Sequence, residues 1–214
     1  MLRLVSARHR LAIRAPQLRA AIRTSTSTTS GSFSSDNAIF MQQSFTTPQV
    51  TENLTETEVL ECQERWAHAI KSISKAYLQK DDYVKEAADA AAELYGYGHS
   101  NVLFKPTRAT KNPFRPTGED AMSYFVGSEA MGNDNFAGED AGFAINGGKG
   151  WSDVVFTNHQ IELLGPAAVA MGSYEFTCAT TGETATVEYS FGYKRNEDGK
   201  ARIFLHHSSV PYRA

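Results

Sequence analysis

Apolar residues recur at helical spacing in the middle of the chain. Between residues 51 and 80 they fall at steps of three and four, which predicts one long helix with a single apolar face. This apolar face consists of Val59, Cys62, Trp66, Ile70, Ile73 and Tyr77. Thr55 and Glu58 have the spacing of a capping box at the start of that helix. A second, alanine-rich helix is expected over residues 83–95, with Gly96 as its stop.

The remainder of the chain changes to strand patterning. After a proline-rich loop and a short helical stretch that begins at Thr117, segments rich in β-branched and aromatic residues are separated by turn signals. The expected strands are 151–158, 160–164, 167–179, 184–195 and 201–210. Helices followed by a strand meander predict an α+β fold, with an antiparallel sheet that has helices packed on one face.

The amino-terminal region differs from the rest in charge. Residues 1–35 contain six arginines and no acidic residue, whereas all 24 acidic residues and 15 of the 21 basic ones come later. An acid-free leader rich in Arg and Ser is typical of an organelle transit peptide. We therefore expect residues 1–48 to be a transit peptide and linker, and residues 49–214 to form the folded domain. A basic arm for nucleic acid or acidic lipid is the other interpretation of the leader.

The leader also suggests a destination. It lacks the apolar core of a secretory signal, and its arginines alternate with leucine and isoleucine in a pattern that suits an amphipathic helix. This favours import into the mitochondrial matrix, with the chloroplast stroma as the alternative.

Composition narrows the classes of function. The chain of 214 residues carries a formal net charge of −3, so its balance does not resemble that of a nucleic-acid binder. Two cysteines are too few for a disulfide scaffold. No run of eighteen apolar residues is present, and we expect no membrane span. The glycines of residues 142–150 do not have the spacing of a phosphate-binding loop.

The last expected strand carries the most informative polar residues. It reads Ile-Phe-Leu-His-His-Ser-Ser from residue 203 to residue 209. Because adjacent side chains of a strand point to opposite faces, one His and one Ser two residues apart share each face. Such a pair can hold a water molecule or take a proton from it near neutral pH. A zinc site built from His99, His159 and one histidine of this strand is the metal alternative.

Several stretches of the sequence resemble the iota-class carbonic anhydrases. They are 94–107, 114–119, 124–127, 147–151 and the His-His-Ser-Ser tail. The order of elements also resembles the association domain of calcium/calmodulin-dependent kinase II and the SnoaL-like, nuclear-transport-factor-2-like superfamily. The resemblance covers about residues 52–212. It implies a cone-shaped sheet wrapped around the helices, with one deep pocket.

The resemblance implies an activity and a set of site residues. The activity is the reversible hydration of CO2 to bicarbonate in a pocket of hydroxyl side chains and one histidine, without a metal cofactor. Manganese or zinc is the alternative. Carried over to this sequence, the site residues are Thr107, Tyr124, His207 and Ser209. The second pair, His206 and Ser208, stays open, as does Thr110 in place of Thr107.

The resemblance also implies partners and competing functions. CO2 and bicarbonate are the expected ligands, and many relatives dimerise through their sheets, so a homodimer is the simplest assembly. A non-catalytic association module like that of the kinase is one alternative function. Another SnoaL-like small-molecule enzyme, such as an isomerase or cyclase, is the second.

Overall fold

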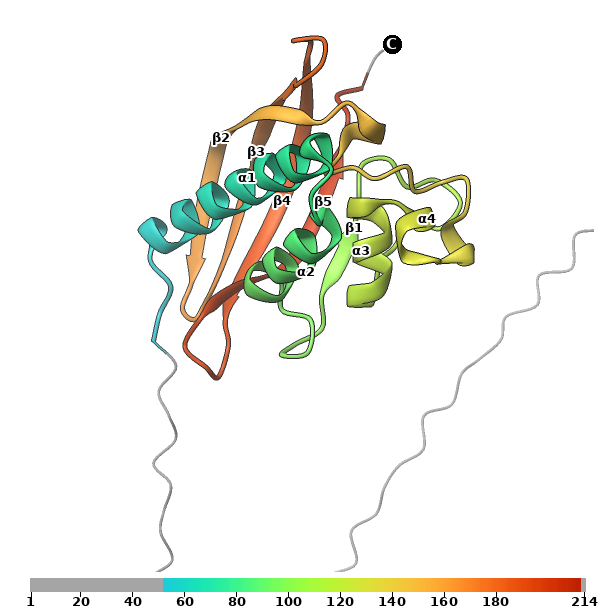
Figure 1. Ribbon diagram of the computed structural model, residues 1–214. Coiled ribbons are helices and arrows are strands. Elements are labelled where there is room, and N and C mark those ends of the chain that lie inside the picture. The colour runs from blue at the N-terminus through green and yellow to red at the C-terminus, as the bar shows by residue number, and fades with distance from the viewer. Residues whose placement is uncertain (1–51, 213–214) are drawn as a thin grey trace, which may run out of the picture. The chain divides into compact units, whose positions relative to one another are not determined.

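The computed structural model describes residues 52–212, in which helices precede most of a five-stranded sheet (Figure 1). The helices are α1 (Glu56–Gln79), α2 (Tyr83–Leu94), α3 (Gly118–Val126) and α4 (Ser128–Met131), with short 3-10 helices η1 (Asp134–Phe136) and η2 (Asn146–Gly148). The strands are β1 (Leu103–Lys105), β2 (Trp151–Leu164), β3 (Ala167–Cys178), β4 (Thr184–Arg195) and β5 (Ala201–Ser209). The expected transit peptide lies outside the described residues.

Helix α1 begins where the sequence predicts. Thr55 is its N-cap, and the reciprocal hydrogen bonds of the capping box with Glu58 are both present. Its apolar face is buried, and Trp66, 2% exposed, packs against rings from four strands of the sheet. Helix α2 is capped by Asp82, and α3 has a second capping box formed by Thr117 and Asp120. The predicted helices are confirmed.

The sheet has the strand order β1-β5-β4-β3-β2. Strands β2 to β5 pair antiparallel as predicted, whereas β1 joins the edge of the sheet parallel to β5. The two strands expected at 151–158 and 160–164 are one continuous strand. A register shift between Asn158 and Gln160 explains the difference, because a bulge at His159 interrupts the alternation without ending the strand.

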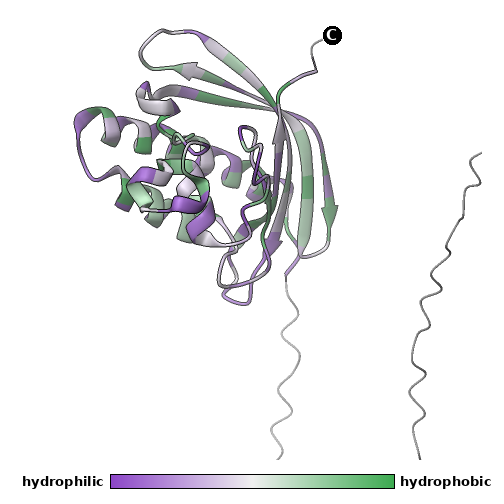
Figure 2. Ribbon diagram, turned by 90° about the vertical axis from the view of Figure 1, so that its right-hand side faces the viewer, coloured by the Kyte–Doolittle hydropathy of each residue, from purple (hydrophilic) through white to green (hydrophobic). Residues whose placement is uncertain are grey.

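Helices and sheet form two layers. The sheet curves around α1, while α2 and α3 lie on the same side of it, and Figure 2 shows the strands from their edge. The core lies between the layers and includes the inward-facing rings of Tyr174, Phe176, Phe191 and Tyr193. The predicted α+β fold, with helices on one face of a curved sheet, is confirmed. No helix in residues 52–212 is long and apolar enough to cross a membrane.

A second bulge lies in β5 and decides which of its side chains face inward. Ile203 pairs with Tyr193 and Leu205 pairs with the adjacent Gly192, so Phe204 is an extra residue without a partner. A Cβ on Gly192 would lie 2.8 Å from the Phe204 ring, so the bulge needs glycine opposite it. Because one extra residue reverses the alternation, side chains after the bulge face the opposite way from the pattern before it.

Candidate active site

Strand β5 directs His206 and Ser208 into the interior. Each is 2% exposed, whereas His207 is exposed on the outer face of the sheet and Ser209 is half-buried there. The prediction that His207 and Ser209 face the pocket is therefore wrong, and the second pair takes that place. The prediction extended the inward face of Ile203 by strict alternation, which the bulge at residue 204 reverses.

The imidazole of His206 is enclosed by aromatic rings. Phe104 and Phe191 stack on it, with ring centroids 4.6 and 4.1 Å away. Its Nδ1 lies 2.8 Å from the Tyr95 hydroxyl, and its Nε2 lies 3.4 Å from the Tyr174 hydroxyl. Burial, followed by the charge of the neighbouring His207, lowers the pKa of His206 to about 3. The ring is therefore neutral at physiological pH.

Four hydroxyl groups gather beside His206, and we call them the hydroxyl cluster: Thr107, Tyr124, Tyr174 and Ser208. Thr107 donates a hydrogen bond to Ser208, with 2.8 Å between the oxygens. Burial raises the pKa of Tyr124 and Tyr174 far above the usual range of tyrosine. Hydrogen bonding to Thr107 counteracts part of that rise in both tyrosines, as Ser208 does for Tyr174. All four groups are thus protonated and able to donate or accept hydrogen bonds at neutral pH.

A cleft of about 980 Å³ borders the hydroxyl cluster at Thr107. Thr107 belongs to the cleft and to the hydroxyl cluster, since it lines the cleft and contacts Ser208. The guanidinium of Arg108 lies at the same cleft, 5.5 Å from the centre of the Phe143 ring and 5.8 Å from that of Trp151. The cleft therefore presents one cation and apolar walls in front of the buried hydroxyls.

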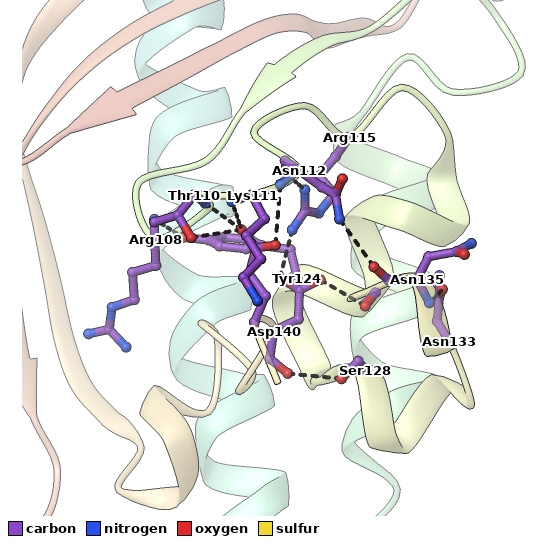
Figure 3. Close-up of polar contacts among 12 residues, drawn as sticks. Arg108, Thr110, Lys111, Asn112, Arg115, Tyr124, Ser128, Asn133, Asn135 and Asp140 are labelled. Atoms are coloured by element: carbon purple, nitrogen blue, oxygen red, sulfur yellow. Dashed lines mark hydrogen bonds and ion pairs between the residues drawn. The ribbon is translucent and has the colours of Figure 1, made fainter. Parts of the chain in front are cut away.

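One carboxylate accepts three backbone hydrogen bonds from the loop that carries Thr107. Glu139 accepts hydrogen bonds from the backbone N–H groups of Thr110, Lys111 and Asn112, at 3.0 Å for Lys111 and 3.3 Å for Asn112. Figure 3 labels the three donor residues. Burial raises the pKa of Glu139, but these hydrogen bonds outweigh it and lower the pKa overall. Thr110 is thus an anchor of the loop, and Thr107 is the threonine that contacts the cluster.

A buried ion pair supports the same loop from below. Arg115 Nη2 lies 2.7 Å from the Asp140 carboxylate, and both side chains are at most 1% exposed. Ser123, on α3 next to Tyr124, donates a hydrogen bond of 2.8 Å to the other oxygen of Asp140. Breaking a buried pair of this kind leaves an uncompensated charge. The pair therefore ties the loop to the helix that positions Tyr124 (Figure 3).

The alternative metal site does not assemble. His159 lies at the bulge of β2 and lines a groove on the outer face with His207, whereas His99 lies in the turn after α2. Within residues 52–212, no group of three or more His, Cys, Asp or Glu side chains is arranged to hold a metal ion.

Comparison with known proteins identifies the family of this chain. Residues 57–210 match a family model described as metal-independent carbonic anhydrase. The chain belongs to this family. A metal-independent carbonic anhydrase from Nostoc sp. is 38% identical over 184 residues, which cover 83% of this chain and 84% of that protein.

One solved structure shows the same relationship. The crystal structure of an iota-carbonic anhydrase from a cyanobacterium, complexed with bicarbonate, has a TM-score of 0.69 and 36% identity, covering 78% of this chain and 99% of that one. A structure from Thiobacillus denitrificans, described as a putative calcium/calmodulin-dependent protein kinase type II association domain, has a TM-score of 0.45 at 12% identity and covers 71% of this chain and 93% of that one. The family description agrees with the expectation that no cofactor is needed.

The sequence analysis missed two residues of this site, Tyr174 and Glu139. Tyr174 was not among the expected site residues, although it shares the inward face of β3 with Phe176. The available signal was the alternation of β3, which places Tyr174 on the face of the sheet that packs against the helices. Glu139 had no local signal, because its partners lie about thirty residues earlier in the chain.

Proposed function

We propose that this chain catalyses the reversible hydration of CO2 to bicarbonate and a proton, at the hydroxyl cluster. The observation that carries the proposal is the convergence of Thr107, Tyr124, Tyr174 and Ser208 beside the enclosed ring of His206. Membership of the metal-independent carbonic anhydrase family supports the reaction class.

The cluster suits a reaction between two small neutral molecules. Tyr124 stacks on Phe143, with ring centroids 5.4 Å apart, and meets Phe104 edge-to-face at 5.7 Å, so CO2 finds an apolar wall beside the hydroxyls. Thr107 and Ser208 orient a water molecule whose oxygen forms the new bond to the carbon of CO2. The tyrosine hydroxyls donate hydrogen bonds to the oxygen on which negative charge develops.

The proton released by the water needs a route to solvent. His206 is a poor acceptor, because burial lowers its pKa to about 3. The Thr107 hydroxyl, which donates to Ser208 before the reaction, turns towards the cleft. Ser208 then accepts the proton of the water as it gives its own to Thr107, and half-buried Thr107 passes one to a buffer molecule in the cleft. The atoms balance, since CO2 and water become bicarbonate and one proton. Turnover is expected to be slower than with a metal-bound hydroxide.

The experiment is stopped-flow CO2 hydration by the full chain. Thr107→Val keeps the shape of the side chain and removes its hydroxyl, so we expect kcat/KM to fall about 100-fold. Thr110→Val is the matched control in the same loop, because it keeps the backbone N–H that binds Glu139, and it is expected to retain activity. A wild-type rate no faster than buffer refutes the proposed reaction, and equal effects of the two variants refute the role of Thr107.

We propose that the protein forms a homodimer through the outer face of its sheet. Val155, Met171 and Leu103 are all more than half exposed on that face, which favours burial against a second copy. Sedimentation velocity is expected to show a dimer for the wild type and a monomer for Met171→Glu. Leu60→Glu, on the exposed side of α1, is the matched control, and a monomeric wild type at tens of micromolar refutes the dimer.

We propose import into the mitochondrial matrix, supported by the arginine-rich, acid-free composition of residues 1–35. A fluorescent protein carrying residues 1–48 is expected to enter mitochondria. Fluorescence that fills the chloroplast stroma instead refutes the proposal.

A further inference from the structure

A line of hydrogen bonds runs behind His206, away from the cleft. The indole N–H of Trp66, on α1, donates to the Tyr95 hydroxyl at 3.0 Å. That hydroxyl lies 2.8 Å from Nδ1 of His206. Trp66 and Tyr95 are each 2% exposed, so water does not replace these partners. The contacts join helix α1 and the end of α2 to the ring in β5.

Counting protons along this line fixes the tautomer of His206. An indole nitrogen only donates, so the Tyr95 oxygen accepts from Trp66 and keeps its own proton to give. Within residues 52–212, Nδ1 of His206 is the acceptor in contact with that proton. If Nδ1 carried a proton, the buried Tyr95 hydroxyl would have no acceptor, which is costly. The neutral ring therefore carries its proton on Nε2.

The other side of the ring faces the hydroxyl cluster. Nε2 of His206 lies 3.4 Å from the Tyr174 hydroxyl, and hydrogen bonding links Tyr174 to Ser208 and Thr107. With its proton on Nε2, His206 donates to Tyr174, and Tyr174 donates its own proton onward into the cluster. Each donor from Trp66 to Tyr174 then points from the core of the protein towards the hydroxyl cluster.

We propose that Trp66 and Tyr95 are positioning residues that hold His206 as an Nε2–H donor. Tyr174 is then a further catalytic residue, which accepts the hydrogen bond of His206 and donates its own to the reacting oxygen. His206 stabilises the negative charge that forms on bicarbonate and does not take the proton from water. This inference rests on the proposed CO2 hydration, and it reassigns the role of the histidine in that reaction.

The direct test is the protonation pattern of the His206 ring. Two-bond 1H–15N NMR spectra of the full chain labelled with 15N-histidine distinguish the two neutral tautomers, and His206→Gln assigns the signals. We expect Nδ1 to be unprotonated and Nε2 protonated at pH 7. A ring protonated on Nδ1 overturns the inference, and if that protein still hydrates CO2, the proposed function stands without it.

Variants then connect the tautomer with catalysis. Tyr95→Phe is expected to shift the ring signals towards the other tautomer and to lower kcat/KM about tenfold. Tyr174→Phe is expected to lower kcat/KM about 100-fold. Tyr193→Phe is the matched control, because this buried tyrosine stacks on the same Phe191 and, among the described residues, has no hydrogen bond to His206.

The outcomes separate the two proposals. Normal ring signals and normal activity in Tyr95→Phe overturn the inference, as does an equal loss of activity in Tyr193→Phe. A wild type that shows the expected tautomer but no CO2 hydration overturns the proposed function, and with it the catalytic role of Tyr174.

Discussion

The two faces of β5 carry the same residue types one position apart and place them in opposite surroundings. On the inner face, His206 and Ser208 lie among aromatic rings and the hydroxyl cluster. On the outer face, His207 is exposed and Ser209 donates a long hydrogen bond of 3.4 Å to Glu188. The difference shows that residue type alone does not define this site. Enclosure lowers the basicity of the inner histidine and directs its hydrogen bonds.

The largest expected difference between the faces is in stability. His206→Ala leaves a cavity between the stacked rings of Phe104 and Phe191, and we expect it to lower the free energy of unfolding by about 2–4 kcal/mol. His207→Ala removes an exposed ring and is expected to change it by less than about 0.5 kcal/mol.

Urea unfolding of both variants at one protein concentration checks this comparison, because the stability of a dimer depends on concentration. A larger loss in the outer variant than in the inner one would show that the enclosure of His206 is not what stabilises this part of the sheet.

The second-largest expected effect is a loss of stability on acidification, caused by His206 on the inner face. The pKa of His206 is lowered to about 3 in the folded protein, against 6.5 for the free side chain. The unfolded chain therefore binds a proton between these values, and the stability present above pH 6.5 is lost as the pH falls towards 3. Between pH 7 and pH 5, protonation of this histidine in the unfolded chain is expected to lower the free energy of unfolding by about 2 kcal/mol.

The comparison protein for the pH measurement is His206→Gln, with the free energy of unfolding determined at both pH values. Its loss between pH 7 and pH 5 should be smaller than that of the wild type by about 2 kcal/mol. Equal losses in the two proteins would mean that His206 already binds its proton in the folded state.

The smallest expected effect concerns the loop beside the inner face. Glu139→Gln replaces one of the two oxygens that accept from the backbone of residues 110–112 with an amide that donates. We expect kcat/KM for CO2 to fall about fivefold, because Thr107 loses its fixed position. Glu129→Gln, on the exposed side of α4, is the matched control. Full activity in Glu139→Gln would show that the loop holds its shape without this carboxylate.

The local parts of the fold could be predicted from the sequence. Capping boxes and apolar spacing are properties of a few adjacent residues, so the starts of α1 and α3 and the apolar face of α1 are confirmed. Turn residues between strands likewise marked the hairpins. The edge strand β1 was different, because its parallel pairing with β5 joins residues about one hundred positions apart.

The orientation of the site could not be obtained from alternation alone. Strict period-two counting from Ile203 places His207 inward, and the unpaired Phe204 reverses the result. The signal lay in the neighbouring strand, where Gly192 gives the bulge its room. Gly172, opposite the bulge of β2, follows the same rule. Thr107 and Tyr124 were placed by resemblance, and the structure brings both to the inner face.

The most direct test of the account is CO2 hydration by Ser208→Ala and Ser209→Ala, measured on the full chain after exhaustive chelation. The inner hydroxyl accepts the hydrogen bond of Thr107, so we expect Ser208→Ala to lower kcat/KM about 100-fold. Ser209→Ala should stay within about twofold of the wild type, which itself should keep its activity through chelation. A crippled Ser209→Ala beside an active Ser208→Ala, or activity that chelation abolishes and one metal restores stoichiometrically, would contradict the account.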